Sequence, residues 1–230
     1  WLKRYLKNKS LWVLNEADYN IASSLGFIPV LIPNSYERIT DKVYPKSCEK
    51  SGIKTILLCG TITPRKGQLE VLHWLGRMKF NGCVHIVGPV RDIESKDDKY
   101  FSEVQRLSKL VDYQVIIYGR QKDVVPFYLK ADVTILNSSL EGMPNVLIES
   151  IAYGIPCIST DIPGNRDILK DIGSELLYER NSFSSFRASF DFINSTRYKD
   201  ISKRSLEIYA RKFSVEGVVK QFEEECLGSF

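Results

Sequence analysis

Arg65 and Lys66 are adjacent cations in a loop that has a glycine at each end. The loop has the sequence Gly60-Thr61-Ile62-Thr63-Pro64-Arg65-Lys66-Gly67. Glycines let a backbone turn sharply and approach a ligand closely, and the helix predicted to follow offers free N–H groups to an anion. Arg65 and Lys66 add positive charge, so a phosphate or diphosphate is the natural ligand. A solvated basic loop explains this segment equally well when it is taken alone.

The same loop departs from two common nucleotide-binding patterns. It does not fit Gly-x-Gly-x-x-Gly, which binds dinucleotides. It does not fit the P-loop either, because Lys66 precedes its glycine and Gln68 follows that glycine. Both departures weaken the dinucleotide and P-loop interpretations.

Two carboxylates accompany a second predicted helix start. Glu141 lies in the loop before this helix and Glu149 lies inside the helix. A carboxylate close to an anion-binding helix start needs another role, because two anions repel each other. Accepting hydrogen bonds from sugar hydroxyls is such a role. A surface glutamate followed by an ordinary helix glutamate is the alternative.

The helix start itself predicts a second anion site. Pro144 suits the first helical position. The backbone N–H groups that follow would then be unpaired and would point out of the helix, where the helix dipole adds to them. These N–H groups belong to Asn145, Val146 and Leu147.

A third strand end carries Tyr118, Gly119 and Arg120. Exposed backbone at such a turn can hydrogen-bond a nucleobase, and the ring of Tyr118 or the guanidinium of Arg120 could stack on one. An ordinary connection between a strand and a helix explains the segment as well.

The cysteines and histidines predict no metal centre. The cysteine count of five is odd, no two cysteines form Cys-x-x-Cys, and Cys59, Cys83 and Cys157 lie in or beside apolar runs. Reduced, buried thiols in a cytosolic protein are therefore expected, rather than a disulfide framework or a zinc site. His85 falls inside an apolar run, which favours a packed strand position.

Composition fits a globular protein of 230 residues, with 43% hydrophobic and 26% charged residues and a net charge of +4. These values exclude a disordered or fibrous chain, and a dedicated nucleic-acid binder usually carries more clustered positive charge. No apolar run reaches the ~18 residues of a membrane span. The start lacks both a signal-peptide core and a methionine, so we expect a cytoplasmic protein and a fragment of something longer.

A basic cluster near the start leaves a peripheral contact with the inner face of a membrane open. Its members are Lys3, Arg4, Lys7 and Lys9. A solvated helix face is the favoured interpretation of such a cluster.

Strand-like and helix-like segments that alternate from about residue 50 would position these groups. Strands are predicted at 53–59, 83–87, 114–118, 133–136 and 156–159, and helices at 68–79, 97–110, 124–130 and 145–153. Buried strands separated by helices predict an α/β fold with a doubly wound, Rossmann-like parallel sheet. All three candidate loops would then lie at the carboxyl edge of that sheet.

The two ends of the chain differ from this central part. Apolar runs at 11–14 and 29–32 flank a helix-like stretch at 16–25, and residues 36–51 are polar and irregular, which predicts a linker. Residues 182–227 are predicted to be helical, with a last helix capped by Ser214.

Together these segments resemble the nucleotide-sugar-dependent glycosyltransferases of the GT-B fold, family 4 type (glycosyltransferase group 1). The most specific part is the Glu-x7-Glu pattern of Glu141 and Glu149, in the run Ser-Leu-Glu-Gly-Met-Pro-Asn-Val-Leu-Ile-Glu-Ser. The later Gly-Ile-Pro, the Tyr118-Gly119 pair and Phe-Ser-Val-Glu at 213–216 match further landmarks in order. The resemblance runs over roughly residues 25–227.

The resemblance implies how the chain is divided. Residues 1–35 look like a remnant of the N-terminal acceptor domain, 36–51 like the interdomain linker and 52–195 like the nucleotide-sugar-binding domain. Residues 196–230 look like the C-terminal helices that pack back toward the first domain. The chain would then be the donor-binding half, namely the C-terminal half, of a GT-B fold.

The resemblance also implies a donor site. Arg65 and Lys66 would bind the donor diphosphate beside Gly60 and Thr61, and Glu141 would contact the transferred sugar. The helix-start amides of 145–147 would bind the distal phosphate. The ribose hydroxyls would go to Glu149, and the loop of Tyr118, Gly119 and Arg120 would face the base. Glu141, Lys66 and Arg65 are the predicted catalytic residues.

The implied activity is anomeric-retaining transfer of a sugar from a nucleoside-diphosphate sugar to an acceptor sugar or glycolipid, in surface polysaccharide or glycolipid synthesis. Fixed cations and helix dipoles would stabilise the leaving group, so neither a cofactor nor a metal is expected. One departure concerns the family's Gly-Arg pair, because Thr61 stands where that arginine is common. A nucleotide-sugar-binding domain without turnover, or another GT-B enzyme such as an epimerase or a phosphorylase, remains an alternative.

Overall fold

The computed structural model describes residues 9–40, 52–90, 96–194 and 197–226. A parallel sheet in the order β5-β4-β3-β6-β7-β8 forms its centre. The strands are β3 (Thr55–Cys59), β4 (Cys83–Val87), β5 (Gln114–Gly119), β6 (Val133–Leu136), β7 (Cys157–Thr160) and β8 (Leu177–Tyr178). The predicted α/β class and doubly wound parallel sheet are confirmed.

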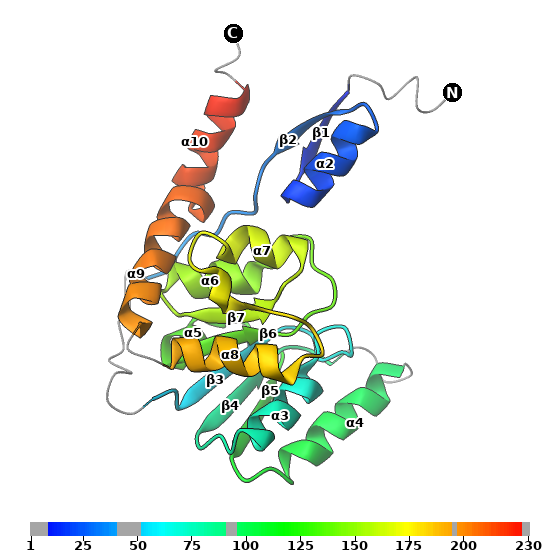
Figure 1. Ribbon diagram of the computed structural model, residues 1–230, viewed down its shortest axis with the longest axis vertical. Helices are drawn as coiled ribbons and strands as arrows, with labels where there is room; N and C mark the ends of the chain where they lie inside the picture. Colours follow the sequence, from blue (N-terminus) through cyan, green and yellow to red (C-terminus); the bar gives the residue numbers. More distant parts are fainter. Residues whose placement is uncertain (1–8, 41–51, 91–95, 195–196, 227–230) are drawn as a thin grey trace.

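Helices cover both faces of this sheet (Figure 1). They are α3 (Gln68–Arg77), α4 (Lys96–Ser108), α5 (Val125–Lys130), α6 (Asn145–Ala152), α7 (Pro163–Leu169) and α8 (Phe183–Ile193). Trp74 of α3 packs on Phe186 of α8 at 4.9 Å between ring centroids, which places these two helices on one face. Tyr128 of α5 packs on the other face, against Leu57.

Strand β3 shows why both faces must be covered. Ile56, Leu57 and Leu58 are all buried, although successive side chains point to opposite sides of the sheet. Ile56 and Leu58 join the larger core cluster, whereas Leu57 packs with Val87 and Tyr128. A strand that is apolar on both faces is stable only between two layers of helices.

The strand order reverses between β3 and β6. From β3 the chain winds outward through β4 to β5, then returns to β6 on the other side of β3. Such a reversal leaves a crevice outside the carboxyl ends of the two central strands. The loops that leave these two strands are 60–67 and 137–144, which contain the predicted cations and Glu141.

A smaller unit precedes the sheet and packs beside α7 (Figure 1). It consists of β1 (Ser10–Val13), α2 (Glu16–Ser24) and β2 (Ile28–Leu31), and β1 pairs with β2 in parallel. Asn15 caps α2, because its side-chain oxygen accepts the N–H of Asp18 at 2.9 Å. The strand–helix–strand order predicted at this end is confirmed; the residues preceding it, among them Lys3, Arg4 and Lys7, lie outside the described ranges.

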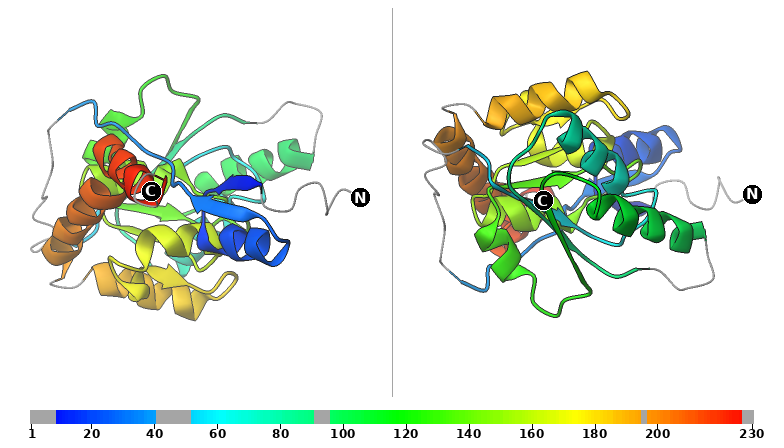
Figure 2. Two further views of the ribbon diagram at one scale, coloured as in Figure 1. Left: turned by 90° about the horizontal axis from the view of Figure 1, so that it is seen from above. Right: turned by 90° about the horizontal axis from the view of Figure 1, so that it is seen from below.

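The C-terminal helices run from the sheet back to this unit, as the views in Figures 1 and 2 show. Helix α9 (Tyr198–Ile208) continues through a π-helical turn η3 (Tyr209–Phe213) into α10 (Val215–Cys226). The hydroxyl of Ser214 accepts the N–H of Gly217 at 3.0 Å, which confirms the predicted cap. Phe222 of α10 meets Trp12 of β1 edge to face, at 6.2 Å between centroids.

Three features of the fold differ from the prediction. Neither helix α7, at residues 163–169, nor the short edge strand β8 was predicted. Pro144 is the N-cap of α6 rather than its first helical residue, with ψ at 114°. The predicted linker is irregular at 36–40, and its remainder, 41–51, lies outside the described residues.

Candidate functional site

The loops 60–67 and 137–144 pack closely against each other through their backbones. Gly67 begins α3 in the left-handed region (φ 64°), and a Cβ there would lie 2.4 Å from Nδ2 of Asn137. That amide group donates to the carbonyl of Gly67 at 3.0 Å, and Tyr178 donates to its Oδ1 at 3.1 Å. Only glycine fits at this junction, because any side chain would collide with the neighbouring loop.

An ion pair joins the predicted cations to the predicted sugar-binding carboxylate. Nζ of Lys66 lies 2.5 Å from Oε1 of Glu141, and the two side chains are only 11% and 10% exposed. Arg65 is half exposed, with its Nη1 3.9 Å from Oε2 of Glu141 and 2.9 Å from the carbonyl of Leu140. The N–H of Ser139 donates to the carbonyl of Arg65 at 2.9 Å. The structure therefore gathers all three predicted catalytic residues in one cluster.

The start of α6 offers fewer free amides than predicted. The N–H of Leu147 donates to the carbonyl of Pro144 at 3.1 Å, so the prediction that it is unpaired was wrong. The tighter first turn that follows an N-cap proline accounts for this bond. The backbone N–H groups of Asn145 and Val146 have no acceptor within the described ranges. Asn145 also holds Asn34, whose Nδ2 lies 2.9 Å from the Asn145 Oδ1.

Glu149 lies on the buried side of α6 and is bound by a tyrosine that sequence reasoning missed. The hydroxyl of Tyr128 donates to Oε2 of Glu149 at 2.8 Å. Burial raises the pKa of the Glu149 carboxyl above its usual range, and the bond from Tyr128 acts in the opposite direction. The contact joins α5 to α6 across twenty-one positions of sequence, so no local pattern could have revealed it.

Cys59, at the end of β3, lies between Lys66 and the hydrogen-bonded pair of Tyr128 and Glu149. Its thiol contacts the hydroxyl of Tyr128, and both Glu149 and Lys66 act on it electrostatically. Burial raises the pKa of this thiol to about 11, so it stays protonated at neutral pH. Because Lys66 and Glu149 share this one neighbour, they lie on the same edge of the sheet.

The third predicted segment, 118–120, borders the site but offers fewer unpaired polar groups to a ligand than predicted. The ring of Tyr118 packs against Phe127 at 4.7 Å between centroids. The carbonyl of Gly119 already accepts the N–H of Gly88 at 2.9 Å. Arg120 is exposed and remains able to meet a ligand.

Gly60 and Thr61 lie at the inner end of the basic loop. Gly60 has φ 133°, and its carbonyl would lie 2.0 Å from a Cβ on Gly88, so the two strand ends are in close contact. The carbonyl of Thr61 accepts from Nε2 of Gln68 at 3.0 Å. Both residues shape the loop, and neither brings a charge to it.

Neither a cluster of metal ligands nor a membrane-spanning helix is found among the described residues. Within those ranges, no group of three or more His, Cys, Asp or Glu side chains gathers as metal ligands would. His85 packs in the sheet against Tyr118 and Phe127, and Cys59, Cys83 and Cys157 are free thiols, of which Cys157 is buried. None of the helices in the described ranges is both long enough and apolar enough to cross a bilayer.

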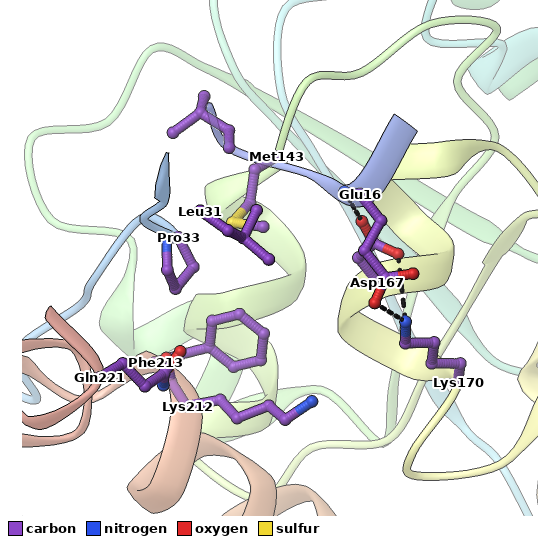
Figure 3. Close-up of a pocket in the computed structure, with 10 residues that line it drawn as sticks. Glu16, Leu31, Pro33, Met143, Asp167, Lys170, Lys212, Phe213 and Gln221 are labelled. Carbon is purple, nitrogen blue, oxygen red and sulfur yellow. Dashed lines mark hydrogen bonds and ion pairs between the residues drawn. The ribbon is translucent and has the colours of Figure 1, made fainter. Parts of the chain in front are cut away.

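A separate pocket lies where the N-terminal unit, α7 and α10 meet (Figure 3). Its wall combines apolar and charged side chains: Leu14, Leu31, Pro33, Met143, Phe213, Gln221, Glu16, Asp167, Lys170 and Lys212. Figure 3 shows the ammonium of Lys170 facing the carboxylates of Glu16 and Asp167. Its Nζ lies 2.5 Å from Oε1 of Glu16 and 3.5 Å from Oδ1 of Asp167. None of the predicted site residues lines this pocket, although Met143 belongs to the same loop as Glu141.

The chain is similar to curated glycosyltransferases. The chain is 28% identical to a lipopolysaccharide 1,6-galactosyltransferase of Escherichia coli K12 over 197 residues, and 30% identical to the Salmonella typhimurium protein of that name over 195 residues. Each match covers 74% of this chain and 50% of the relative, so the chain spans about half the length of these curated relatives.

Solved structures share the fold. Anabaena Alr3699/HepE in complex with UDP superposes with a TM-score of 0.78 at 15% identity, over 95% of this chain and 63% of that one. The model of the family described as glycosyl transferases group 1 matches residues 41–213. That match takes in the sheet, the basic loop and both glutamates, and the chain belongs to the glycosyl transferases group 1 family.

Proposed function

We propose that this chain is the donor-binding half of a retaining glycosyltransferase that uses a nucleoside-diphosphate sugar. One observation carries the proposal. Lys66, Arg65 and Glu141 meet across the two loops at the switch point, beside the free amides of α6. Cations and amides suit a diphosphate, and carboxylates suit sugar hydroxyls, so the cluster fits both parts of such a donor.

Each residue takes a role in this proposal. Lys66 and Arg65 bind the diphosphate, and the amides of Asn145 and Val146 bind its distal phosphate. Glu141 contacts the transferred sugar, and Glu149 accepts hydrogen bonds from the ribose. The exposed Arg120, at the end of β5, faces the base.

The chemistry is electrostatic stabilisation of a leaving group. As the bond between the sugar and the diphosphate breaks, negative charge develops on the nucleoside diphosphate. Lys66 is nearly buried, so its charge acts through a medium less polar than water and is screened less. Fixed cations and the α6 dipole then supply stabilisation without a metal or another cofactor. Glu141 is not assigned the role of a nucleophile.

The relatives indicate which donor and acceptor to test first. Two are named lipopolysaccharide 1,6-galactosyltransferases, and a structural neighbour is a complex with UDP. We therefore propose a UDP-hexose as donor and a glycolipid as acceptor, in the synthesis of a surface polysaccharide or glycolipid. A glycolipid acceptor would bring the protein to the cytoplasmic face of a membrane.

The proposal is tested by calorimetric titration with UDP, GDP and ADP and with their hexose derivatives. We expect at least one of them to bind. Because a hydrogen bond to a charged group contributes about 1.5–3 kcal/mol, Lys66→Ala should weaken that binding ~10- to 100-fold. Glu149→Ala should weaken it as well.

Lys109→Ala is the matched control. Lys109 is exposed and follows α4 near the opposite edge of the sheet, so its removal changes net charge equally without touching the site. The absence of binding to every nucleotide, in a folded sample, would refute the donor site. Binding without transfer by this chain alone is expected both of a donor-binding half and of a nucleotide-sugar-binding domain, whereas transfer to a glycolipid by this chain alone would contradict the assignment of a donor-binding half.

A further inference from the structure

The Glu149 carboxylate is held by Tyr128, which is buried in the core where no ligand can displace it. Tyr128 has no exposed surface, and its hydroxyl lies 2.8 Å from Oε2 of Glu149. Its ring stacks on Tyr153 at 6.3 Å between centroids, with an angle of 23° between the planes. Leu57 and Val87 complete the packing around it. The position of the hydroxyl is therefore fixed by the core.

The direction of this hydrogen bond is fixed as well. Burial raises the pKa of the Tyr128 phenol far above its usual range, so the hydroxyl keeps its proton at any physiological pH. An ionised carboxylate only accepts hydrogen bonds, so Tyr128 must donate to Glu149. The Cys59 thiol, which also contacts this hydroxyl, stays protonated too.

A carboxylate held by one oxygen presents the other in a defined direction. Oε2 of Glu149 is taken by Tyr128, and no partner for Oε1 is found in the described part of the chain. Glu149 is partly exposed. Oε1 is thus the atom that remains for a ligand.

We propose that Tyr128 is a positioning residue for nucleoside recognition, which orients Glu149 so that its free oxygen accepts a hydrogen bond from a ribose hydroxyl. This inference rests on the proposed donor site. In this inference, the site prefers ribonucleotides over deoxyribonucleotides because of Tyr128, a buried side chain that touches no ligand. A merely structural tyrosine would affect stability and leave that preference unchanged.

The test compares ribose with deoxyribose on two matched variants. Tyr128→Phe removes the hydroxyl from Glu149. Tyr153→Phe removes a neighbouring hydroxyl whose partners are the hydroxyl of Tyr36, at 3.0 Å, and the N–H of Ile39, at 3.4 Å. Both variants lose one buried oxygen from the same aromatic stack. Dissociation constants are measured for UDP, 2′-deoxy-UDP and 3′-deoxy-UDP, or for the corresponding set of whichever nucleotide binds, and thermal melting checks that each variant is folded.

We expect the wild-type protein to prefer UDP over at least one deoxy analogue by about tenfold, as one hydrogen bond to a charged group allows. In Tyr128→Phe the preference should fall to about threefold or less, and in Tyr153→Phe it should stay at the wild-type value. An unchanged preference in Tyr128→Phe, or an equal loss in both variants, would overturn the inference. If no nucleotide binds the folded wild-type protein, the proposed donor site fails instead.

Glu149→Gln decides the question if Tyr128→Phe does not fold. The Tyr128 hydroxyl can then donate to the amide oxygen or accept from the amide NH2 group, and in either case the group left for the ribose is uncharged. The charge-assisted bond is then lost, and the preference should fall to about threefold or less. Full retention of the wild-type preference in Glu149→Gln would show that the preference does not come from this carboxylate, which overturns the inference.

Discussion

At the scale of single residues, the ion pair of Lys66 and Glu141 means that Glu141 and a bound phosphate would compete for the Lys66 ammonium. Both side chains are about nine-tenths buried, and their charged atoms lie 2.5 Å apart. A nearly buried cation needs an anion beside it, and Glu141 provides one within the protein itself. A phosphate that binds Lys66 must therefore share this cation with Glu141 or displace it, which frees the carboxylate to meet the sugar.

Glu141→Gln should for this reason tighten the binding of a nucleoside diphosphate that lacks the sugar. The neutral amide no longer neutralises Lys66, so we expect UDP to bind about three- to tenfold more tightly, or roughly 0.7–1.4 kcal/mol. Calorimetric titration measures this change. Glu175→Gln is the control, because this exposed glutamate precedes β8, near the opposite edge of the sheet. Weaker or unchanged UDP binding in Glu141→Gln would show that no such competition exists.

Sequence alone locates the charged residues of the site but not all the contacts around them. The loop with Arg65 and Lys66 and the pair Glu141 and Glu149 could be selected by residue type and spacing, since the loop follows a predicted strand and the two glutamates stand on either side of a predicted helix start. The bond from Tyr128 could not be predicted, because it depends on how two helices pack across the sheet.

At the scale of elements, the predictable segments are those with long periodic or apolar patterns. The strand 83–87 and the strand 133–136 have the bounds expected from their apolar runs. Helix α7 was missed because its seven residues begin Pro-Gly, a pair that locally favours a turn. Its helical form depends on packing, since Gly164 lies directly against the loop of Glu141.

Two glycine substitutions should therefore have opposite effects on stability. A Cβ on Gly164 would lie 2.1 Å from the carbonyl oxygen of Gly142, so Gly164→Ala must displace α7 or the loop. We expect a loss of about 1–3 kcal/mol in the free energy of unfolding. Gly76 lies inside α3 with nothing within 4 Å of its Cβ position, so Gly76→Ala should gain up to about 1 kcal/mol. Denaturant titration measures both, and an unchanged or increased stability of Gly164→Ala would contradict the close approach of α7.

At the scale of the whole molecule, polar contacts join the N-terminal unit to the sheet domain. The N–H of Glu16 donates to Oδ2 of Asp167 at 2.7 Å, and Lys170 pairs with Glu16. Asn15 donates to the carbonyl of Gly142 at 3.0 Å, in the same loop as Glu141. The position of this unit could not be predicted from sequence, because each contact joins residues more than a hundred positions apart.

Asp167→Ala should loosen the N-terminal unit and leave the central sheet intact. Asp167 is the acceptor at the start of α2, where an anion also interacts favourably with the helix dipole. A hydrogen bond to a charged group contributes about 1.5–3 kcal/mol, so amide hydrogen exchange in 10–31 should become about tenfold faster or more. Exchange in β3 and β6 should not change. Asp161→Ala, which removes a neighbouring carboxylate paired only with Arg166 among the described residues, should leave both regions at wild-type rates. Faster exchange throughout the sheet in Asp167→Ala would mean instead that the unit and the sheet unfold as one cooperative body.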